Sequence, residues 1–298
     1  MKLSICLPTY NREKKATFQL KELIKQLSTL QNHHEIEILV SDNCSNDYTF
    51  EKLMSIKESF GSDLIIKIFR QNLNLGLVGN LGYLYNIASG KYIWFISDDD
   101  ILYENTIKKI IELIDTFSNR NFYLLNFSTE NNNIINKAPY FPEDTQDYYT
   151  LINDNTWGGF GLLSVQVLQK DKFSEIFSNT ELMKNLCMPV TVSFYGLFHL
   201  NGYLDLKNKY VVHHVGDYSW QPQAIKVFSI FLFDAITELK NLGLDINIYK
   251  IIKNRLIEMN NFRISSIKYT IKNLDIAYIR KLKNEKLLYS LILRTIKK

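Results

Sequence analysis

The sequence has 298 residues, of which 46% are hydrophobic and 22% charged, with a formal net charge of +4. This length suits one large domain or two small ones, and the balance excludes a disordered or fibrous chain. No apolar run is long enough to cross a bilayer, and the apolar segment 3–7 stops at Pro8, too early for a signal peptide. The three cysteines show neither a paired nor a zinc-binding spacing, which favours a reducing cytoplasm.

The charge is unevenly distributed along the chain. Residues 249–298 contain thirteen Lys or Arg and three Asp or Glu, a surplus of ten, which leaves the first 248 residues at about −6. A basic helical tail of this kind can rest on an anionic membrane, which would place the protein peripherally on the cytoplasmic face of the inner membrane. The alternative is a solvated helical bundle or the surface of a homo-oligomer. We expect no nucleic-acid partner.

The first 127 residues alternate between strand and helix patterns. Asn11 is expected to cap the first helix, and Gly90 is expected to end the third. The expected strands are 3–7, 35–41, 64–69, 91–97 and 122–127, and the helices after the first are 47–59, 77–89 and 104–117. Repeated βαβ units predict an α/β fold, a mostly parallel sheet with helices on both faces.

The remainder of the chain has a different pattern. The segment 128–154 is polar and irregular and connects to a second half. From residue 165 the pattern is chiefly helical, apart from an expected strand at 209–215, and from residue 224 we expect helices to the end. The fold prediction is therefore an α/β sheet followed by a largely helical C-terminal region.

Three adjacent carboxylates, Asp98, Asp99 and Asp100, follow the fourth expected strand and are called the aspartate run below. Ligands of open α/β sheets bind outside the carboxyl ends of the strands, where residues 8–11 and 42–43 also lie. Adjacent like charges repel, and Mg²⁺ or Mn²⁺ offsets this while keeping positions open for phosphates. Asp100 can alternatively cap the next helix, but one Asp would satisfy that role. We predict a metal–diphosphate site here.

Five short motifs occur in a fixed order within the first 120 residues. They are Leu7-Pro8-Thr9-Tyr10-Asn11-Arg12, Ile38-Leu39-Val40-Ser41-Asp42-Asn43-Cys44-Ser45-Asn46-Asp47, Asn74-x-Gly76, Ala88-Ser89-Gly90-Lys91-Tyr92-Ile93 and Ser97-Asp98-Asp99-Asp100. In order and spacing they resemble the family 2 glycosyltransferases with the GT-A fold. In style they are most similar to the subgroup that includes abequosyltransferases and related O-antigen or capsule enzymes.

The resemblance implies roles for the matching positions. Residues at three strand ends would hold the nucleotide. Pro8, Thr9 and Tyr10 would line its pocket. Asp42 would contact the base, and Asp98 would face the ribose or diphosphate. Asp47 is expected to cap the helix that follows it.

The resemblance also implies a metal, Mn²⁺ or Mg²⁺. Asp99 would ligate it, and Asp100 can share that role because the triple run leaves the register of the D-x-D pattern open. The His213-His214 pair matches a place where many relatives carry a further metal or diphosphate ligand, and His214 is favoured. A structural role for the two histidines is the alternative.

Two positions depart from the family pattern. Many relatives carry Arg in the helix after Asn-x-Gly, where this chain has Leu81, so its diphosphate would depend more on the metal. Relatives also often carry Glu-Asp in the acceptor half, with the Asp as general base, but that place falls on Val190-Thr191. An inverting transfer needs a base for the acceptor hydroxyl proton, whereas a retaining one does not. The candidate bases, in order of preference, are Asp154, Glu181 and Asp217.

The implied function is a metal-dependent glycosyltransferase in bacterial surface polysaccharide synthesis. It would move a sugar from a nucleoside diphosphate sugar to a glycan or lipid-linked acceptor, with inversion expected. Residues 1–127 would bind the donor, 128–223 would form the acceptor half of the same GT-A domain, and 224–298 would form the basic helical region. The alternatives are a sugar nucleotidyltransferase and a catalytically decayed sugar-nucleotide-binding protein.

Overall fold

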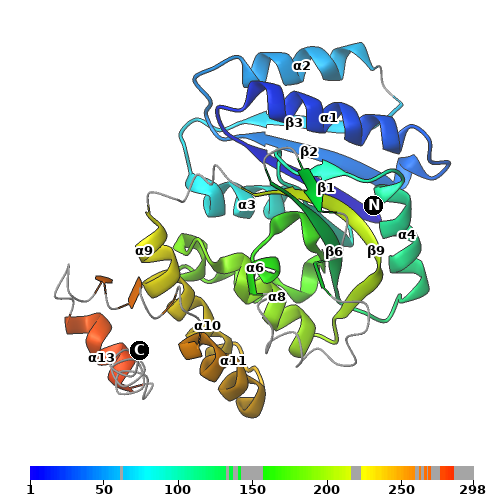
Figure 1. The fold of residues 1–298 in the computed structure, drawn as a ribbon. Coiled ribbons are helices and arrows are strands. Elements are labelled where there is room, and N and C mark those ends of the chain that lie inside the picture. Colours follow the sequence, from blue (N-terminus) through cyan, green and yellow to red (C-terminus); the bar gives the residue numbers. More distant parts are fainter. Residues whose placement is uncertain are drawn as a thin grey trace.

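A computed structural model describes most of the chain. The described residues are 1–60, 63–131, 134–136, 140–141, 157–215, 223–258, 262, 265–266, 268–269 and 276–284. Among them, nine strands form one mixed sheet (Figure 1). None of the helices in these ranges combines the length and the apolar character that crossing a membrane requires.

Four parallel strands form the first part of the sheet, in the spatial order β3-β2-β1-β4. They are β1 (Leu3–Thr9), β2 (Ile36–Asp42), β3 (Ile65–Arg70) and β4 (Tyr92–Phe95), with β1 between β2 and β4. Every residue of β1 and β2 is buried, because helices cover both faces, and this explains their nearly continuous apolar sequences. The α/β prediction for this half is confirmed.

Helices cover the two faces of this sheet (Figure 1). On one face lie α1 (Glu13–Leu27), α2 (Thr49–Ser59) and α4 (Thr106–Thr116). On the other lie α3 (Gly76–Ile87), α6 (Trp157–Phe160) and α8 (Met188–Phe198). Strands β1, β2 and β3 each lead through a loop to a helix, whereas β4 leads to the short strand Ile101–Leu102. Because the four strands are parallel, the loops after them lie at one edge of the sheet.

The second part of the sheet is mixed in direction. It contains β5 (Ile101–Leu102), β6 (Phe122–Asn131), β7 (Ile134–Asn136), β8 (Gln166–Gln169) and β9 (Tyr203–His214). Strand β8 lies antiparallel between β4 and β6, and β9 lies between β6 and β5. Both halves of the chain thus contribute to one continuous sheet.

Two expectations for this region were wrong. The segment that forms β8 was expected to be helical. It is a strand of only four residues, too few for period-2 alternation to be distinguished from a helical pattern. Strand β9 begins at Tyr203 rather than residue 209. Its register with β6 shifts at Asn126, and this irregularity interrupts the alternating sequence pattern in the first part of the strand.

Short helical turns connect these elements. They are η1 (His33–Glu35), η2 (Leu163–Val165), η3 (Lys170–Lys172), α7 (Ser174–Ser178) and η4 (Leu182–Lys184). Their hydrogen bonds close on residues three or four positions away, so they reverse the chain between the longer elements.

The C-terminal region is helical, as expected. It consists of α9 (Ala224–Lys226), the π-helical turn η6 (Val227–Phe231), α10 (Leu232–Asn241), α11 (Ile246–Glu258) and α13 (Ile276–Asn284). The Thr191 hydroxyl donates to the Ala235 carbonyl at 3.0 Å, and the Asn185 amide donates to the Phe231 carbonyl at 2.8 Å. The first bond joins α8 to α10, which lies beside it in Figure 1, and the second joins the segment before α8 to the π-helical turn.

Candidate functional site

The carboxyl ends of β1, β2 and β4 meet because β1 pairs with both of its neighbours. Thr9, the last residue of β1, lies opposite Asp42, the last residue of β2. The Thr9 hydroxyl donates 2.7 Å to Asp98 Oδ2, two residues beyond Ile96, whose backbone N–H still bonds to β1. The structure therefore brings the predicted nucleotide-binding positions of three strands together. Tyr10 follows at the surface with 38% exposure.

A guanidinium group lies between two residues of the aspartate run. Arg12 Nη1 is 2.8 Å from Asp98 Oδ1 and 2.6 Å from Asp99 Oδ2, so two carboxylate oxygens converge on one nitrogen. Lys15 Nζ lies 3.9 Å from Asp99 Oδ2, and the Ser97 hydroxyl donates to Asp99 Oδ1. Both carboxylates are thus oriented from several sides.

Burial and these contacts shift the ionisation of the cluster. Burial raises the pKa of Asp98 to about 6, although the charge of Arg12 and the Thr9 hydrogen bond act in the opposite direction. For Asp99, burial is outweighed by hydrogen bonds from Ser97 and Arg12, and its pKa lies below the ordinary value. Burial would lower the pKa of Arg12, but Asp98 and Asp99 together raise it. Perturbed groups gathered at a sheet edge are typical of functional sites.

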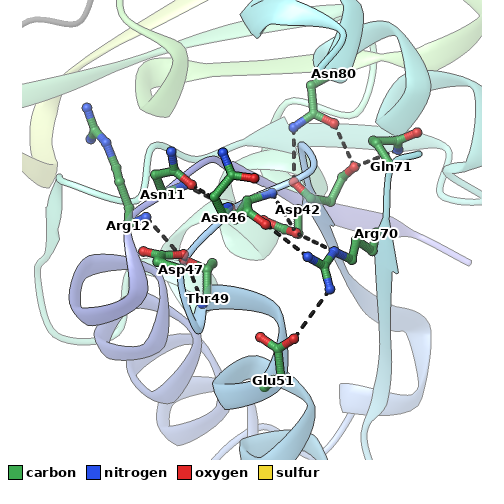
Figure 2. Close-up of polar contacts among 12 residues, drawn as sticks. Asn11, Arg12, Asp42, Asn46, Asp47, Thr49, Glu51, Arg70, Gln71 and Asn80 are labelled. Atoms are coloured by element: carbon green, nitrogen blue, oxygen red, sulfur yellow. Dashed lines mark hydrogen bonds and ion pairs between the residues drawn. The ribbon is translucent and has the colours of Figure 1, made fainter. Parts of the chain in front are cut away.

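Asp42 lies at this edge but is completely buried. Its carboxylate accepts hydrogen bonds from the Ser45 hydroxyl and, at 3.2 Å, from the Ser45 N–H. Arg70 Nε lies 3.7 Å from Asp42 Oδ2, and the same guanidinium donates to the Ser45 carbonyl and approaches Glu51 (Figure 2). Asp42 therefore fixes its own loop.

A second set of hydrogen bonds ties the loop after β1 to the loop after β2 (Figure 2). Asn11 N donates a hydrogen bond to Ser45 Oγ at 2.8 Å, and Asn46 N donates one to Asn11 Oδ1 at 2.7 Å. Asn11 (φ 52°) and Cys44 (φ 65°) both adopt the left-handed conformation, which non-glycine residues seldom take outside constrained turns. The two loops thus hold one another in a fixed arrangement.

Asp47 contacts the start of both helices that leave these loops. Asp47 Oδ1 accepts from Thr49 N, the first residue of α2, at 3.0 Å, although the N-cap residue of α2 is Tyr48 rather than the expected Asp47. Its other oxygen accepts from Glu13 N at 3.3 Å, at the start of α1. The expectation that Asn11 caps α1 was wrong, because the Asn11 side chain instead accepts from Asn46 N.

The Asn74-x-Gly76 motif joins the same edge. Asn43 Nδ2 donates a hydrogen bond to Asn74 Oδ1 at 2.9 Å, and Asn43 Oδ1 accepts one from Leu75 N at 2.8 Å. Gly76 has φ 72°, a conformation that favours glycine. Asn80 exchanges two hydrogen bonds with Ser41, whose hydroxyl also accepts from Gln71; Figure 2 labels Asn80 and Gln71. All the motifs quoted above, apart from the Gly90 turn, therefore meet at the strand ends.

The two histidines separate at the end of β9. His213 Nδ1 lies 2.8 Å from Asp100 Oδ1, whereas His214 Nδ1 lies 3.4 Å from Glu130 Oε2. Successive residues of a strand point to opposite faces, so the two rings serve different environments. The structure brings His213, rather than the favoured His214, to the aspartate run. Asp100 does not cap a helix.

The position expected for a general base lies inside α8. Val190 and Thr191 are both buried, and Thr191 bonds to α10 as described above. Glu181 is 82% exposed and borders a cavity of about 410 Å³ that shares no residue with the aspartate cluster. The preferred candidate, Asp154, and Asp217 lie outside the described residues.

Leu81, the other departure, lies in the core with 1% exposure. Helix α3 therefore presents no cation at this position. Among the residues that the structure describes, no three His, Cys, Asp or Glu side chains gather to hold a metal by themselves. A metal here would need ligands from a substrate as well.

Comparison with known proteins decides the family. The model of glycosyl transferase family 2 matches residues 4–170, more than half of the chain. This chain belongs to glycosyl transferase family 2. The match runs from β1 to the end of β8.

Individual relatives match over shorter stretches. An abequosyltransferase of Salmonella typhimurium is 30% identical over 117 residues, which are 39% of this chain and 33% of that protein. A poly(ribitol-phosphate) β-N-acetylglucosaminyltransferase, TarS of Staphylococcus aureus, is 33% identical over 116 residues, 39% of this chain and 19% of that protein. The matches thus span a third or less of these relatives.

Solved family structures share the fold over nearly the whole chain. The structure of S. aureus TarS with UDP-GlcNAc aligns with a TM-score of 0.63 at 17% identity, covering 95% of this chain and 79% of that one. A mannosyltransferase of Pyrobaculum calidifontis with GDP-Man and Mn²⁺ aligns with a TM-score of 0.63 at 12% identity, covering 99% and 86%. The GT-A fold prediction is confirmed.

Sequence reasoning missed three cations of this site and one acid. Arg12 belongs to the first motif but was assigned no role from the sequence. Lys15, Arg70 and Glu130 were not among the predicted site residues. The order β2-β1-β4 would have indicated Arg12, because it places the residues after β1 beside those after β4. Helical spacing from Arg12 then points to Lys15.

Proposed function

We propose that this chain is a glycosyltransferase that transfers a sugar from a nucleoside diphosphate sugar to a glycan or lipid-linked acceptor in the synthesis of a bacterial surface polysaccharide. The observation that carries the proposal is the convergence of Asp98 and Asp99 oxygens on one point at the end of β4. The loops after β1 and β2 flank that point. The family membership and the names of the relatives support the proposal.

The residues present fit a divalent cation. Asp98 Oδ1 and Asp99 Oδ2 already direct their lone pairs at a single cationic nitrogen. Mg²⁺ is commonly held by one or two carboxylates together with substrate phosphates, so two carboxylates are a sufficient protein contribution. When bound, Mn²⁺ or Mg²⁺ would stabilise the charge that develops on the leaving diphosphate. The solved structure of the P. calidifontis mannosyltransferase contains both GDP-Man and Mn²⁺, which supports a site for a metal and a nucleoside diphosphate sugar together.

Each residue of the cluster then has a proposed task. Asp99 is the principal metal ligand, and Asp98, whose Oδ2 accepts from Thr9, lies between the metal and the ribose or diphosphate, so that its Oδ1 joins the metal. Tyr10 is exposed where it can contact the nucleotide, and Pro8 belongs to the strand beneath it. Asp42 borders the base pocket, with its loop fixed by Arg70.

The last strand supplies the histidine contact. Asp100 bonds to His213, so His213 orients it, and the contact favours His213 over His214 as the residue that borders the metal. His214 as a metal ligand stays a prediction. Glu130, which contacts His214, extends this polar group along β6.

The acceptor half would supply the proton acceptor for an inverting transfer. Val190 and Thr191 have no ionisable group, so the base must come from elsewhere, and Asp154 stays our first candidate. The division into residues 1–127 for the donor, 128–223 for the acceptor and 224–298 as a helical region is also proposed. Strands β8 and β9 enter the donor half's own sheet, which supports a single GT-A domain.

A nucleotide panel tests the donor site. Full-length protein is heated with Mn²⁺ and each of UDP, GDP, CDP and dTDP, and the melting temperature is measured. We expect one nucleotide to raise it by several degrees only with metal, because binding to the native state stabilises it. Asp99→Ala should abolish the rise, and an undiminished rise would falsify the metal assignment. Binding without sugar transfer from the matching donors would favour a decayed sugar-nucleotide-binding protein.

The exposed basic face of α13 supports a peripheral membrane contact. Tyr278 and Leu282 of this helix are buried, whereas Arg280, Lys281 and Lys283 are exposed. Each such cation near an anionic bilayer contributes about 1 kcal/mol. Sedimentation with phosphatidylglycerol vesicles at low salt should therefore fall several-fold in an Arg280→Gln/Lys283→Gln variant. Equal sedimentation of both proteins would rule out this face, which would leave a helical bundle or a homo-oligomer surface.

A further inference from the structure

Arg12 occupies the point where a divalent cation would bind. Its Nη1 lies 2.8 Å from Asp98 Oδ1 and 2.6 Å from Asp99 Oδ2. Divalent metals of this size bind oxygen at about 2.0–2.2 Å. A metal ligated by the same two oxygens would overlap with the guanidinium nitrogen. Arg12 and the metal therefore exclude one another.

The backbone of Arg12 is held firmly while its side chain has a route to solvent. Arg12 N donates 3.1 Å to Thr49 Oγ1, and the preceding residue, Asn11, is fixed between Ser45 and Asn46. The side chain itself is 25% exposed. A long side chain on a fixed backbone can leave the carboxylates by rotation alone, with no rearrangement of the loop.

Charge balance explains why an arginine lies there in the ligand-free protein. Asp98 and Asp99 are adjacent and largely buried, and two unpaired carboxylates in such a place would repel strongly. Asp100 is already bonded to His213. Lys15 is 45% exposed and reaches only Asp99, at 3.9 Å, so Arg12 provides most of the compensation.

A displaced Arg12, together with Lys15, would also be a cation close to an incoming diphosphate. Helix α3 offers none at Leu81, which is buried. Arg70 is engaged at the other side of Asp42 with Ser45 and Glu51. Guanidinium groups bind phosphate oxygens well, often through two hydrogen bonds.

We propose that Arg12 is a displaceable internal counter-cation: it neutralises Asp98 and Asp99 in the ligand-free protein and moves to the diphosphate when metal and nucleotide bind together. This proposal rests on the proposed metal–diphosphate function. It couples the two ligands, since metal alone must displace Arg12 without compensation, whereas metal with nucleotide gives Arg12 a new partner. The protein would thus bind metal weakly until the donor arrives.

Direct metal binding tests this coupling. Free Mn²⁺ is measured by electron paramagnetic resonance during titration of the full-length protein without nucleotide. Arg12→Gln should bind Mn²⁺ at least about tenfold more tightly than wild type, because it removes a competing charge from two ligands. In the presence of saturating Mn²⁺, the same variant should bind the preferred nucleoside diphosphate about tenfold more weakly. A structural role alone would not move the two affinities in opposite directions.

Two further variants serve as controls. Arg120→Gln removes an equal charge from a loop where the guanidinium contacts Asn201 rather than a carboxylate, and should leave Mn²⁺ affinity within about twofold of wild type. Arg12→Lys keeps the charge and should stay within about threefold, which also guards against misfolding of the Gln variant. Thermal unfolding confirms that each variant is native.

The outcomes separate this proposal from the function on which it rests. Equal or weaker Mn²⁺ binding by Arg12→Gln, with wild type binding Mn²⁺ and nucleotide together, would overturn the role of Arg12 alone. Absence of Mn²⁺ binding by both proteins, even with all four nucleoside diphosphates, would overturn the metal–diphosphate function itself.

Discussion

The strand ends of the first half and the helix α8 of the second half differ in the side chains that they hold. At the strand ends, polar side chains bond to one another across three loops, and two carboxylates share a guanidinium. In α8, Val190 and Thr191 are buried, and the Thr191 hydroxyl donates to the Ala235 carbonyl of α10. The first region gathers charged side chains, whereas the second belongs to the core.

This difference indicates which part of the protein's chemistry is shared and which is its own. The strand-end loops and the aspartate run lie within residues 4–170, the part of the chain that the family model matches. The family model ends at residue 170, before α8.

The largest expected effect concerns the base. Asp154→Asn should leave metal-dependent nucleotide binding intact but reduce sugar transfer about a thousandfold, because general base catalysis contributes on the order of 10²–10⁴. Transfer is measured with the donor identified by the nucleotide panel. Glu181→Gln is the matched control and should transfer normally, since Glu181 is exposed and lies apart from the cluster. Near-normal turnover by Asp154→Asn would move the base elsewhere.

A smaller effect tests whether α8 can regain the family's acid. Thr191→Asp should lower the free energy of unfolding by about 3 kcal/mol, because it buries a carboxyl group opposite the Ala235 carbonyl. Thr191→Val, which only loses the hydrogen bond, should cost about 1 kcal/mol. Both are measured by urea denaturation. If Thr191→Asp were as stable as wild type and faster in transfer, α8 would border the acceptor after all.

A further effect on stability, comparable with that of Thr191→Asp, concerns the cost of charge at the strand ends. The pKa of Asp98 is raised to about 6 from 3.8, so its stabilising contribution is complete below pH 3.8 and is lost as the pH rises through 6. At about 1.4 kcal/mol for each unit of pKa, the loss is about 3 kcal/mol.

Metal-free wild type should therefore lose about 2 kcal/mol of unfolding free energy relative to Asp98→Asn between pH 4 and pH 7, with the rest of the loss below pH 4. Urea denaturation at several pH values measures the difference between the two proteins, which removes the titration of other groups. A constant difference, or one of opposite sign, would show that Arg12 and Thr9 compensate the buried charge fully.

The sequence predicted the first half of the fold well, because its βαβ repeats have long, periodic elements with clear caps. Strand β8 escaped prediction because its pairing with β4 and β6 is determined by residues far away in the chain. The short strand β5 likewise exists only through its pairing with β9. Long-range pairing leaves little signal in a four-residue or two-residue segment.

The candidate site was predicted in its residues more than in its contacts. The aspartate run, Thr9 and Asp42 do lie together, as their positions after neighbouring strands indicated. The pairing of Arg12 with two aspartates and the choice of His213 over His214 depend on strand order and on the face of β9, which one sequence does not reveal. The position of the proposed base depends on the acceptor, and the five motifs contain no information about the acceptor.

The central claim is that Asp98 and Asp99 hold a divalent metal together with the donor's diphosphate. Anomalous scattering from crystals grown with Mn²⁺ and the preferred nucleoside diphosphate tests it most directly. We predict a manganese peak between the Asp99 carboxylate and the diphosphate, with the Arg12 guanidinium moved from its position between the two aspartates. A bound diphosphate without a manganese peak, and with Arg12 still bridging Asp98 and Asp99, would contradict the claim.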